Sequence, residues 1–425
     1  MRLLKENKLL LLIILLALLL RVAPIIFLEF KDPGYHARNI NEIEFYYDDV
    51  ARSLIAGKGF VHSMDPRSET SPYNFKPGTP FGFVPPLYAW WLYIIYFIFG
   101  PNVLIAKLFQ SILDASSCLM IFIIGSKIFR NQRTSLLASG LYAVYPLAIV
   151  MCNTLYYQIP MNIALCWMIL CFMAPVTFKN GIWTGMSVAI SSLAKPVTLP
   201  LIAIIPIIRV VESYVNKTKL KLAMLWAIAF IVASIVTLTP WTIRNYIVFE
   251  KFVPVQQGGP EAFHQGSKED YIDLDVTNLR KKYGDFGIAR DQLTKVAIYN
   301  HINHFRNDPI DYIRFLGKKF LLTWYNTEGK SKNFYVSLIQ LPFLLSAVLG
   351  LLLHFKFWMR DKNWYVPATV LYICAIQVAT FPLVRYTLAV MPLVMLVAAS
   401  GIDILLSKWV EIRTRHANLV EKQER

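Results

Sequence analysis

The chain has 425 residues, of which 56% are hydrophobic and only 16% are charged, and its mean hydropathy is +0.46. A soluble chain carries about a quarter charged residues, so this composition excludes an ordinary water-soluble enzyme and indicates an integral membrane protein. The net charge of +16 would suggest nucleic acid in a soluble protein, but in a membrane protein the Lys and Arg residues must first be sorted by side of the bilayer, and we expect no nucleic-acid partner.

Hydrophobic stretches divide the chain into spans and connections. The stretch 8–28 is long enough to span and lacks the cleavage pattern of a signal peptide, so we expect it to remain as the first span. With it the chain has about ten predicted spans, which makes the fold class an all-α polytopic membrane protein. The other predicted spans are 103–128, 135–150, 159–175, 182–193, 199–208, 222–239, 334–355, 364–380 and 383–406.

The apolar stretch 86–99 is too short to span, and its aromatic residues favour a helix in the membrane interface. If this stretch does not cross, the short connections rich in Lys and Arg all fall on one side, which the positive-inside rule makes the cytoplasm. We therefore predict a cell membrane protein, in the inner or plasma membrane, with both termini cytoplasmic. Segments 29–102 and 241–333 then lie outside, where the active site is expected.

Three parts follow from this topology. Residues 1–240 form a transmembrane core that includes the acidic outer segment 29–102. Residues 241–333 form a mostly helical extracytoplasmic segment, and residues 334–425 supply the C-terminal transmembrane helices and a basic cytoplasmic tail. The helices expected in the extracytoplasmic segment are 288–304 and 310–324.

Two charges, Arg21 and Asp114, fall inside predicted spans, each nearer the outer end. A charge exposed to hydrocarbon is unfavourable, so both side chains should face protein and pair with each other. Such a pair is structural rather than catalytic.

The first outer segment contains an acidic cluster soon after the first span, made of Glu42, Glu44, Asp48 and Asp49. A carboxylate at the outer membrane surface can accept a proton from an acceptor hydroxyl or amine, and it can also hold a divalent cation. The alternative is an acidic turn in water with no chemical role.

An ordered series of motifs runs along the chain. The acidic cluster is followed by Tyr47-x-x-x-Ala51, Gly57-x-Gly59-Phe60 and Pro85-Pro86-Leu87-Tyr88. The later motifs are Tyr145-Pro146, Lys195-Pro196, Pro240-Trp241-x-Ile243-Arg244-Asn245-Tyr246, Arg385-Tyr386-x-Leu388 and Met391-Pro392. The series resembles the GT-C glycosyltransferases, in particular the branch of protein O-mannosyltransferases and the lipid A aminoarabinose transferase. This resemblance implies a transferase that takes a sugar from a polyprenyl-phosphate carrier on the outer face.

The resemblance also implies which acid is catalytic. In the family this acid lies four residues before the tyrosine of the Tyr-x-x-x-Ala motif, where this chain has Ile43. Glu44 is its neighbour, so we predict Glu44 as the base that activates the acceptor, with Asp48 and Asp49 as further catalytic candidates. Val84 stands where relatives often carry Lys or His, so a phosphate or metal contact of those relatives has no counterpart here.

Transfer from a phosphodiester carrier requires cations at headgroup depth, which hold the phosphate and stabilise its growing negative charge. Lys195, Arg244 and Arg385 lie at outer ends of predicted spans, and we predict that they bind the donor phosphate. The alternative for each is an ordinary interface anchor. The candidate substrate contacts are Glu42, Tyr47, His264 and Tyr386, with His264 in a flexible Gly-rich loop.

The sequence therefore predicts an inverting membrane glycosyltransferase. Its partners are the lipid bilayer, a polyprenyl-phosphate-sugar donor and an acceptor that is a protein, a glycolipid or a glycan. No cofactor is certain, and a divalent cation is kept as an alternative. A flippase for a lipid-linked sugar would need the same cations without a base, although no repeat typical of transporters is visible. An inactive scaffold subunit is the third candidate, because of Ile43 and Val84.

Overall fold

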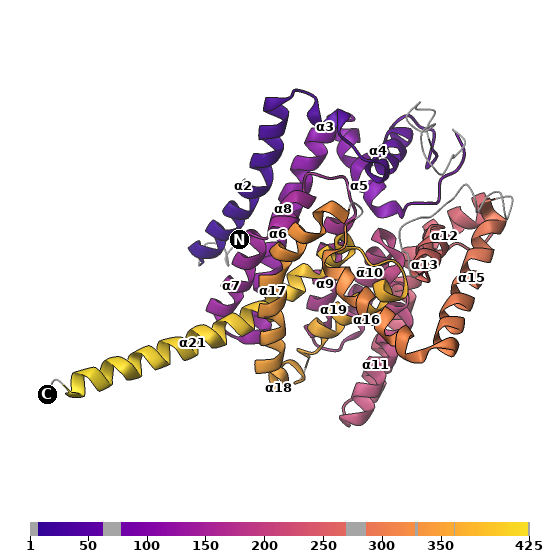
Figure 1. Cartoon of the computed structure of the whole chain (residues 1–425). Coiled ribbons are helices and arrows are strands. Elements are labelled where there is room, and N and C mark those ends of the chain that lie inside the picture. The colour runs from indigo at the N-terminus through magenta and orange to yellow at the C-terminus, as the bar shows by residue number, and fades with distance from the viewer. Residues whose placement is uncertain (1–6, 63–77, 269–285, 328–329, 361, 424–425) are drawn as a thin grey trace.

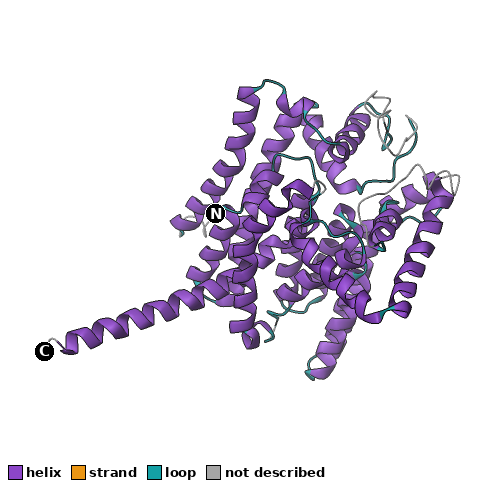
Figure 2. Cartoon of the chain, viewed as in Figure 1, coloured by secondary structure: helices purple, strands orange, loops and turns teal. Residues whose placement is uncertain are grey.

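The computed structural model describes residues 7–62, 78–268, 286–327, 330–360 and 362–423, and this part of the chain is built from helices with no strand (Figure 1, Figure 2). The longer helices are α2 (Lys8–Lys31), α4 (Glu42–Ile55), α5 (Pro86–Phe99), α6 (Val103–Phe129), α7 (Gln132–Ala143), α9 (Gln158–Met173), α10 (Phe178–Ala194), α11 (Leu201–Val215), α12 (Leu220–Phe249), α15 (Phe286–Asn307), α16 (Pro309–Tyr325), α17 (Asn333–Leu353), α19 (Tyr365–Ala379) and α21 (Met391–Gln423). The short ones are α3 (Tyr35–Arg38), α8 (Pro146–Met151), η2 (Pro196–Thr198), α13 (Gly259–Gly266), η3 (Lys330–Lys332), α18 (Phe355–Trp358), α20 (Val384–Thr387) and η4 (Leu388–Val390).

The described residues include six helical segments that are long and apolar enough to cross a bilayer. They are α2, α6, α12, α17, the segment Pro196–Val215 and the segment Val384–Thr414. Helices α5, α9 and α19 are apolar but shorter. The expected all-α, multi-pass membrane fold is confirmed, whereas the number of about ten spans stays a prediction.

Helix boundaries differ from the predicted spans where prolines occur. The span 135–150 divides into α7 and α8, because Pro146 lacks a backbone N–H and begins a new helix. The span 222–239 instead continues as α12 through Pro240, since a long helix tolerates the loss of one hydrogen bond. The division expected at residue 240 therefore lies inside a helix. The span 383–406 begins with the short elements α20 and η4 before α21.

In the N-terminal bundle, α2 packs against α6 and α7. The Arg21 Nε lies 2.5 Å from Asp114 Oδ2, and both side chains are buried. The Tyr142 hydroxyl donates to the other oxygen of Asp114 at 2.7 Å, and Arg21 also donates to the carbonyl of Ala143 at 2.9 Å. The predicted pairing of Arg21 with Asp114 is thus confirmed, and the additional bonds satisfy both charges in the bundle interior.

Helices α10 and α12 lie in close contact because glycines face the contact. A Cβ at Gly181 would lie 2.5 Å from the carbonyl oxygen of Trp226, and a Cβ at Gly185 would collide with the carbonyl of Phe230. Lys195 directly follows the last residue of α10. The close packing of α10 on α12 therefore helps to fix the position of Lys195.

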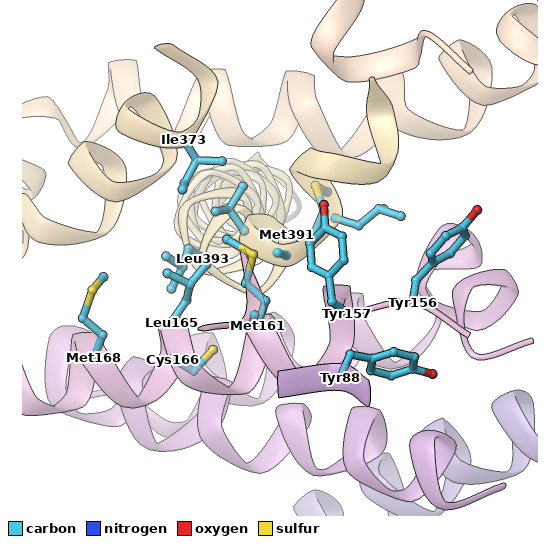
Figure 3. Close-up of a cluster of buried hydrophobic side chains, with 14 of the residues drawn as sticks. Tyr88, Tyr156, Tyr157, Met161, Leu165, Cys166, Met168, Ile373, Met391 and Leu393 are labelled. Carbon is cyan, nitrogen blue, oxygen red and sulfur yellow. The ribbon is translucent and has the colours of Figure 1, made fainter. Parts of the chain in front are cut away.

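The core joins the middle of the chain to its C-terminal helices. Figure 3 shows Met161 and Leu165 of α9 packed beneath Leu393 of α21 and Ile373 of α19, with Tyr157 at the edge of this layer. The first half of α21 is buried in this core, while its second half extends away from the bundle (Figure 1). The apolar layer thus fixes α9, whose start lies beside the polar residues described next.

Candidate functional site

Helix α4 carries all four acids of the cluster, and its first turn fixes the orientation of Glu44. Asn41 accepts from the backbone N–H of Glu44 through Oδ1 (3.1 Å) and donates to Glu44 Oε1 through Nδ2 (2.5 Å). This reciprocal bonding is the arrangement of a helix N-terminal cap, and it fixes the Glu44 side chain. The buried ring of Tyr47 packs edge-on against Tyr88, with 5.0 Å between ring centroids, and so anchors α4 to α5. Glu42 begins α4, but its side chain lies outside the described part of the structure.

Asp48 and Asp49 are buried and have strong partners. Asp48 accepts from the hydroxyl of Tyr96 at 2.6 Å and from Arg52 Nε at 2.8 Å. Asp49 Oδ2 lies 2.7 Å from Nδ1 of His62. These contacts hold α4 to α5 and to the segment that follows α4, which gives both aspartates a structural role. Their catalytic role stays a prediction.

Glu44 differs from the two aspartates because one of its oxygens is left for a further partner. The side chain is only 3% exposed, and within the described chain Oε2 makes no hydrogen bond of good geometry, although the backbone of Leu155 is near enough to lower the pKa of the carboxyl group. Burial raises the pKa of Glu44 to about 7, and the charge of nearby Lys107 opposes this rise. A carboxylate with such a pKa is substantially ionised at neutral pH and still basic enough to accept a proton.

Lys107 of α6 is a buried charge beside Glu44 that the motif comparison missed. Its side chain is 1% exposed, and its Nζ lies 3.3 Å from Nδ1 of His36. The other ring nitrogen of His36 lies 2.9 Å from the carbonyl of Ile25, so it donates there and leaves Nδ1 as an acceptor for the lysine. The signal in the sequence was a lysine inside a predicted span.

Two of the predicted cations lie together with aromatic residues. The Lys195 Nζ is 4.8 Å from the ring centroid of Tyr386 and 5.1 Å from that of Tyr157. Arg385 donates to the hydroxyl of Tyr386 at 3.2 Å and to the hydroxyl of Tyr156 at 3.3 Å. Lys195, Arg385 and Tyr386 are all partly exposed, so an anion can approach them.

Hydrogen bonds connect Arg385 to the acid, and Lys195 joins the same group through its contacts with aromatic rings. The hydroxyl of Tyr156, which accepts from Arg385, donates to Asn41 Oδ1 at 3.0 Å, and Asn41 in turn donates to Glu44. Tyr156 and Tyr157 occupy one edge of the packed layer in Figure 3. Glu44, Arg385 and Lys195, which are far apart in the sequence, thus meet in one group of residues. We call Glu44, Asn41, Tyr156, Arg385, Tyr386 and Lys195 the acid–cation cluster.

Arg244 is not in the acid–cation cluster. Its guanidinium donates to the carbonyls of Phe60 (2.7 Å) and Phe81 (3.2 Å) and lies 4.9 Å from the ring centroid of Trp241. Arg244 therefore ties α12 to both ends of the segment between α4 and α5. This arrangement supports the shape of the first outer segment, and phosphate binding by Arg244 stays a prediction.

His264 lies in a helix rather than in the flexible loop that was expected. The glycines around it permit a short helix, α13, which packs against α15 and contacts α19. Burial lowers the pKa of His264 to about 4, so its ring is neutral at physiological pH. Gly266 at the end of α13 leaves room for the chain to approach Thr380 closely.

The residues present offer little support for a divalent cation. Across the described ranges, no group of three or more His, Cys, Asp or Glu side chains is close enough to hold a metal ion. Asp48 and Asp49 turn to Arg52 and His62 rather than toward a common point. We therefore assign no step to a metal.

Comparison with known proteins supports the sequence resemblance. Residues 84–241 match the family model described as dolichyl-phosphate-mannose-protein mannosyltransferase. The oligosaccharyltransferase AglB of the archaeon Archaeoglobus fulgidus, solved with an inhibitory peptide and a dolichol-phosphate, matches over 98% of this chain with a TM-score of 0.58 at 14% identity. The chain has a GT-C fold. The apo form of the same oligosaccharyltransferase matches 97% of this chain with a TM-score of 0.58 at 13% identity.

The chain spans about half the length of AglB, since the match covers 52% of that protein. A match to ArnT from Cupriavidus metallidurans bound to undecaprenyl phosphate covers 85% of this chain and 74% of ArnT, with a TM-score of 0.38 at 11% identity. None of the curated protein sequences matches the chain. The predicted resemblance to the GT-C superfamily is thus confirmed at the level of the fold.

Proposed function

We propose that the protein is a membrane glycosyltransferase that moves a sugar from a polyprenyl-phosphate donor to an acceptor on the extracytoplasmic face. The observation that carries this proposal is the acid–cation cluster, in which Glu44 and the cations Lys195 and Arg385 belong to one hydrogen-bonded and aromatic group. The matching family model and the AglB neighbour, which was solved with a dolichol-phosphate, support a lipid-phosphate donor.

The cations act on the donor. Lys195 and Arg385 hold the phosphate of the carrier, and their charge stabilises the electron pair that the phosphate oxygen keeps as its bond to the anomeric carbon breaks. Tyr156 and Tyr386 orient the guanidinium of Arg385 through their hydroxyls. The donor reaches this group sideways from the membrane, so no soluble sugar nucleotide is required.

The acid acts on the acceptor. Glu44 takes the proton of the acceptor hydroxyl or amine while the acceptor atom forms a bond to the anomeric carbon. Attack from the side opposite the leaving phosphate inverts the configuration at that carbon. Asn41 holds one oxygen of Glu44, which leaves Oε2 for the acceptor, and Lys107 keeps part of the carboxyl population ionised.

The remaining predicted residues have supporting roles in this proposal. Arg244 shapes the first outer segment, while Asp48 and Asp49 fix α4. Tyr47 packs beside the cluster. The acceptor is a protein, a glycolipid or a glycan, and the peptide bound to AglB favours a protein among these three.

The test is transfer by the purified protein in detergent, with a synthetic polyprenyl-phosphate sugar as donor and a detergent extract of cell membranes as the source of acceptor. A transferase releases free polyprenyl phosphate in this assay, because no sealed compartment is needed for the reaction. A flippase releases none, and neither does an inactive scaffold subunit. Release by the wild type that is lost in Glu44→Gln supports the proposal, whereas equal release by both proteins contradicts the role of Glu44.

A further inference from the structure

A second polar site lies at the other end of the helix bundle. It is a cavity of about 970 Å³ lined by parts of α6, α11, α12 and α18. Its cationic lining residues, which define what we call the basic basin, are Lys127, Arg130, Arg209, Lys219, Arg360 and Lys362. Of the described residues in the lining, Glu212 is the single acid. Lys127 follows Lys107 by 20 residues along α6, which corresponds to about 30 Å, so the basic basin is separate from the acid–cation cluster.

The wall of the basic basin contains cations that are held in place before any ligand arrives. Arg209 is 5% exposed and donates to the carbonyl of Phe172 at 3.1 Å. It also lies 3.3 Å from Glu212, which accepts from the hydroxyl of Tyr365 at 2.6 Å. Lys362 donates to the carbonyl of Ala174 at 2.6 Å. Cations fixed in this way lose little conformational freedom when an anion binds.

An apolar crevice adjoins the basic basin. It has a volume of about 140 Å³, lies between α9, α11 and α19, and shares Arg209 with the basin. Its walls are largely apolar side chains such as Met168, Ile204 and Ile208. Arg209 therefore stands where a cationic site meets an apolar one.

The contact between the basic basin and the apolar crevice indicates which kind of ligand fits. A soluble phosphate compound would use the cations but would gain nothing from the crevice, whereas a lipid with a phosphate headgroup uses both. Helix α11 also exposes Ile207 and Val211, as expected for a helix that faces lipid. We propose that the basic basin binds the headgroup of an anionic, phosphate-bearing membrane lipid whose acyl chain enters the crevice between α9, α11 and α19.

The experiment compares lipid binding by the full-length protein in detergent, measured by native mass spectrometry with phosphatidylglycerol and phosphatidylcholine as probes. We expect the wild type to bind phosphatidylglycerol at least about tenfold more tightly. The triple variant Lys127→Gln/Arg130→Gln/Lys219→Gln removes exposed cations of the basin and should reduce this preference to about twofold or less.

A matched control removes the same charge elsewhere. Lys179, Lys408 and Arg413 are exposed and do not line the basin, so the triple Gln variant of these residues should keep the preference. An equal loss in both triple variants would overturn the proposal, because net charge alone would then account for binding. Displacement of phosphatidylglycerol by an equal concentration of glycerol 3-phosphate would also overturn it, since the site would then recognise a soluble phosphate.

A third variant tests the crevice separately. Ala368 lines the crevice, and Ala368→Phe places a ring in it. We expect this variant to bind long-chain phosphatidylglycerol about tenfold more weakly and the dihexanoyl form with little change. Unchanged binding of both forms, or an equal loss for both, would contradict the entry of an acyl chain. The melting temperature of each variant distinguishes loss of binding from loss of folding.

Discussion

The two ends of the helix bundle present their charges in different ways. At one end, the acid–cation cluster places Arg385 and Lys195 against the tyrosines at positions 156, 157 and 386 and connects them to a buried carboxyl group. At the other end, the basic basin spreads six cations around a large cavity with one described acid. Cations held by neighbouring aromatic groups and joined to an acid suit one defined reaction, while a wide cationic cavity suits a charged headgroup.

The largest effect should come from Glu44, the buried acid of the acid–cation cluster. Glu44→Gln keeps the hydrogen bond to Asn41 but removes the base, and we expect transfer to fall by about 10²–10⁴-fold. Because the pKa of Glu44 is about 7, wild-type activity should rise with pH and level off above about 7, and the variant should lack this rise. Initial rates across this pH range measure both effects.

A matched control for Glu44→Gln is Asp32→Asn, which changes an exposed carboxylate that pairs with Arg38 at the same end. It should leave the rate within about twofold. If Glu44→Gln has the wild-type rate, or keeps the wild-type pH profile, then Glu44 is not the base and the acid–cation cluster is not the catalytic end of the molecule.

A cation of the acid–cation cluster should have the next largest effect. Lys195→Met removes the charge near Tyr157 and Tyr386, and we expect kcat to fall by about 10²–10³-fold, because the phosphate loses a stabilising partner as the sugar leaves. Lys58→Met changes an exposed lysine of the first outer segment and should preserve kcat. Similar rates for both variants would show that Lys195 is only an interface anchor.

The packing of α10 on α12 provides the next test, because Lys195 of the acid–cation cluster directly follows α10. Gly185→Ala pushes a methyl group against the carbonyl of Phe230, and we expect the protein to lose about 1–3 kcal/mol of stability. Gly140→Ala is the control, since a Cβ there meets nothing within 4 Å. Thermal unfolding in detergent compares them, and equal melting temperatures would mean that α10 and α12 separate easily.

The last effect, of similar size, is the change in the stability of the folded protein as Glu44 ionises. Its pKa is about 7 in the fold and lower in the unfolded chain, so the folded state binds more protons between these values and stability falls as pH rises through 7. Glu44→Gln removes this dependence, and at pH 8 we expect the variant to be more stable by on the order of 2 kcal/mol. Melting temperatures at pH 5 and pH 8 test the sign, and a variant less stable at pH 8 would contradict it.

Some parts of the fold could be predicted because they follow from local patterns. The helix 86–99 has the bounds of the apolar stretch from which it was predicted, with Pro86 in its first turn and Gly100 as its C-cap. The pairing of Arg21 with Asp114 followed from the need to neutralise two charges in spans. Pro240, expected at the end of a span, lies inside α12, because a proline in a long helix removes only one bond; the end of the span itself stays a prediction.

The candidate site could be predicted only in part. Glu44, Lys195 and Arg385 were found from motifs, but the motifs gave no reason to separate Arg244 from them, since all three cations lie near ends of predicted spans. The bonds of Arg244 to Phe60 and Phe81 depend on how a distant segment folds over α12. His264 was expected in a loop because glycines flank it, and packing on α15 instead favours a helix.

The sequence alone determined that this chain lies in a membrane, where its acids and basic residues fall along it, and which superfamily it resembles, because these properties depend on composition and on the order of residues. Only the tertiary structure decided that Glu44 joins Arg385 through Asn41 and Tyr156 and has Lys107 as a neighbour, and that six cations surround one cavity at the opposite end. The physical reason is that hydrogen bonds and shifts of pKa by burial depend on groups within a few ångströms of each other. Side chains that are hundreds of residues apart in the sequence come within that distance only when the helices pack.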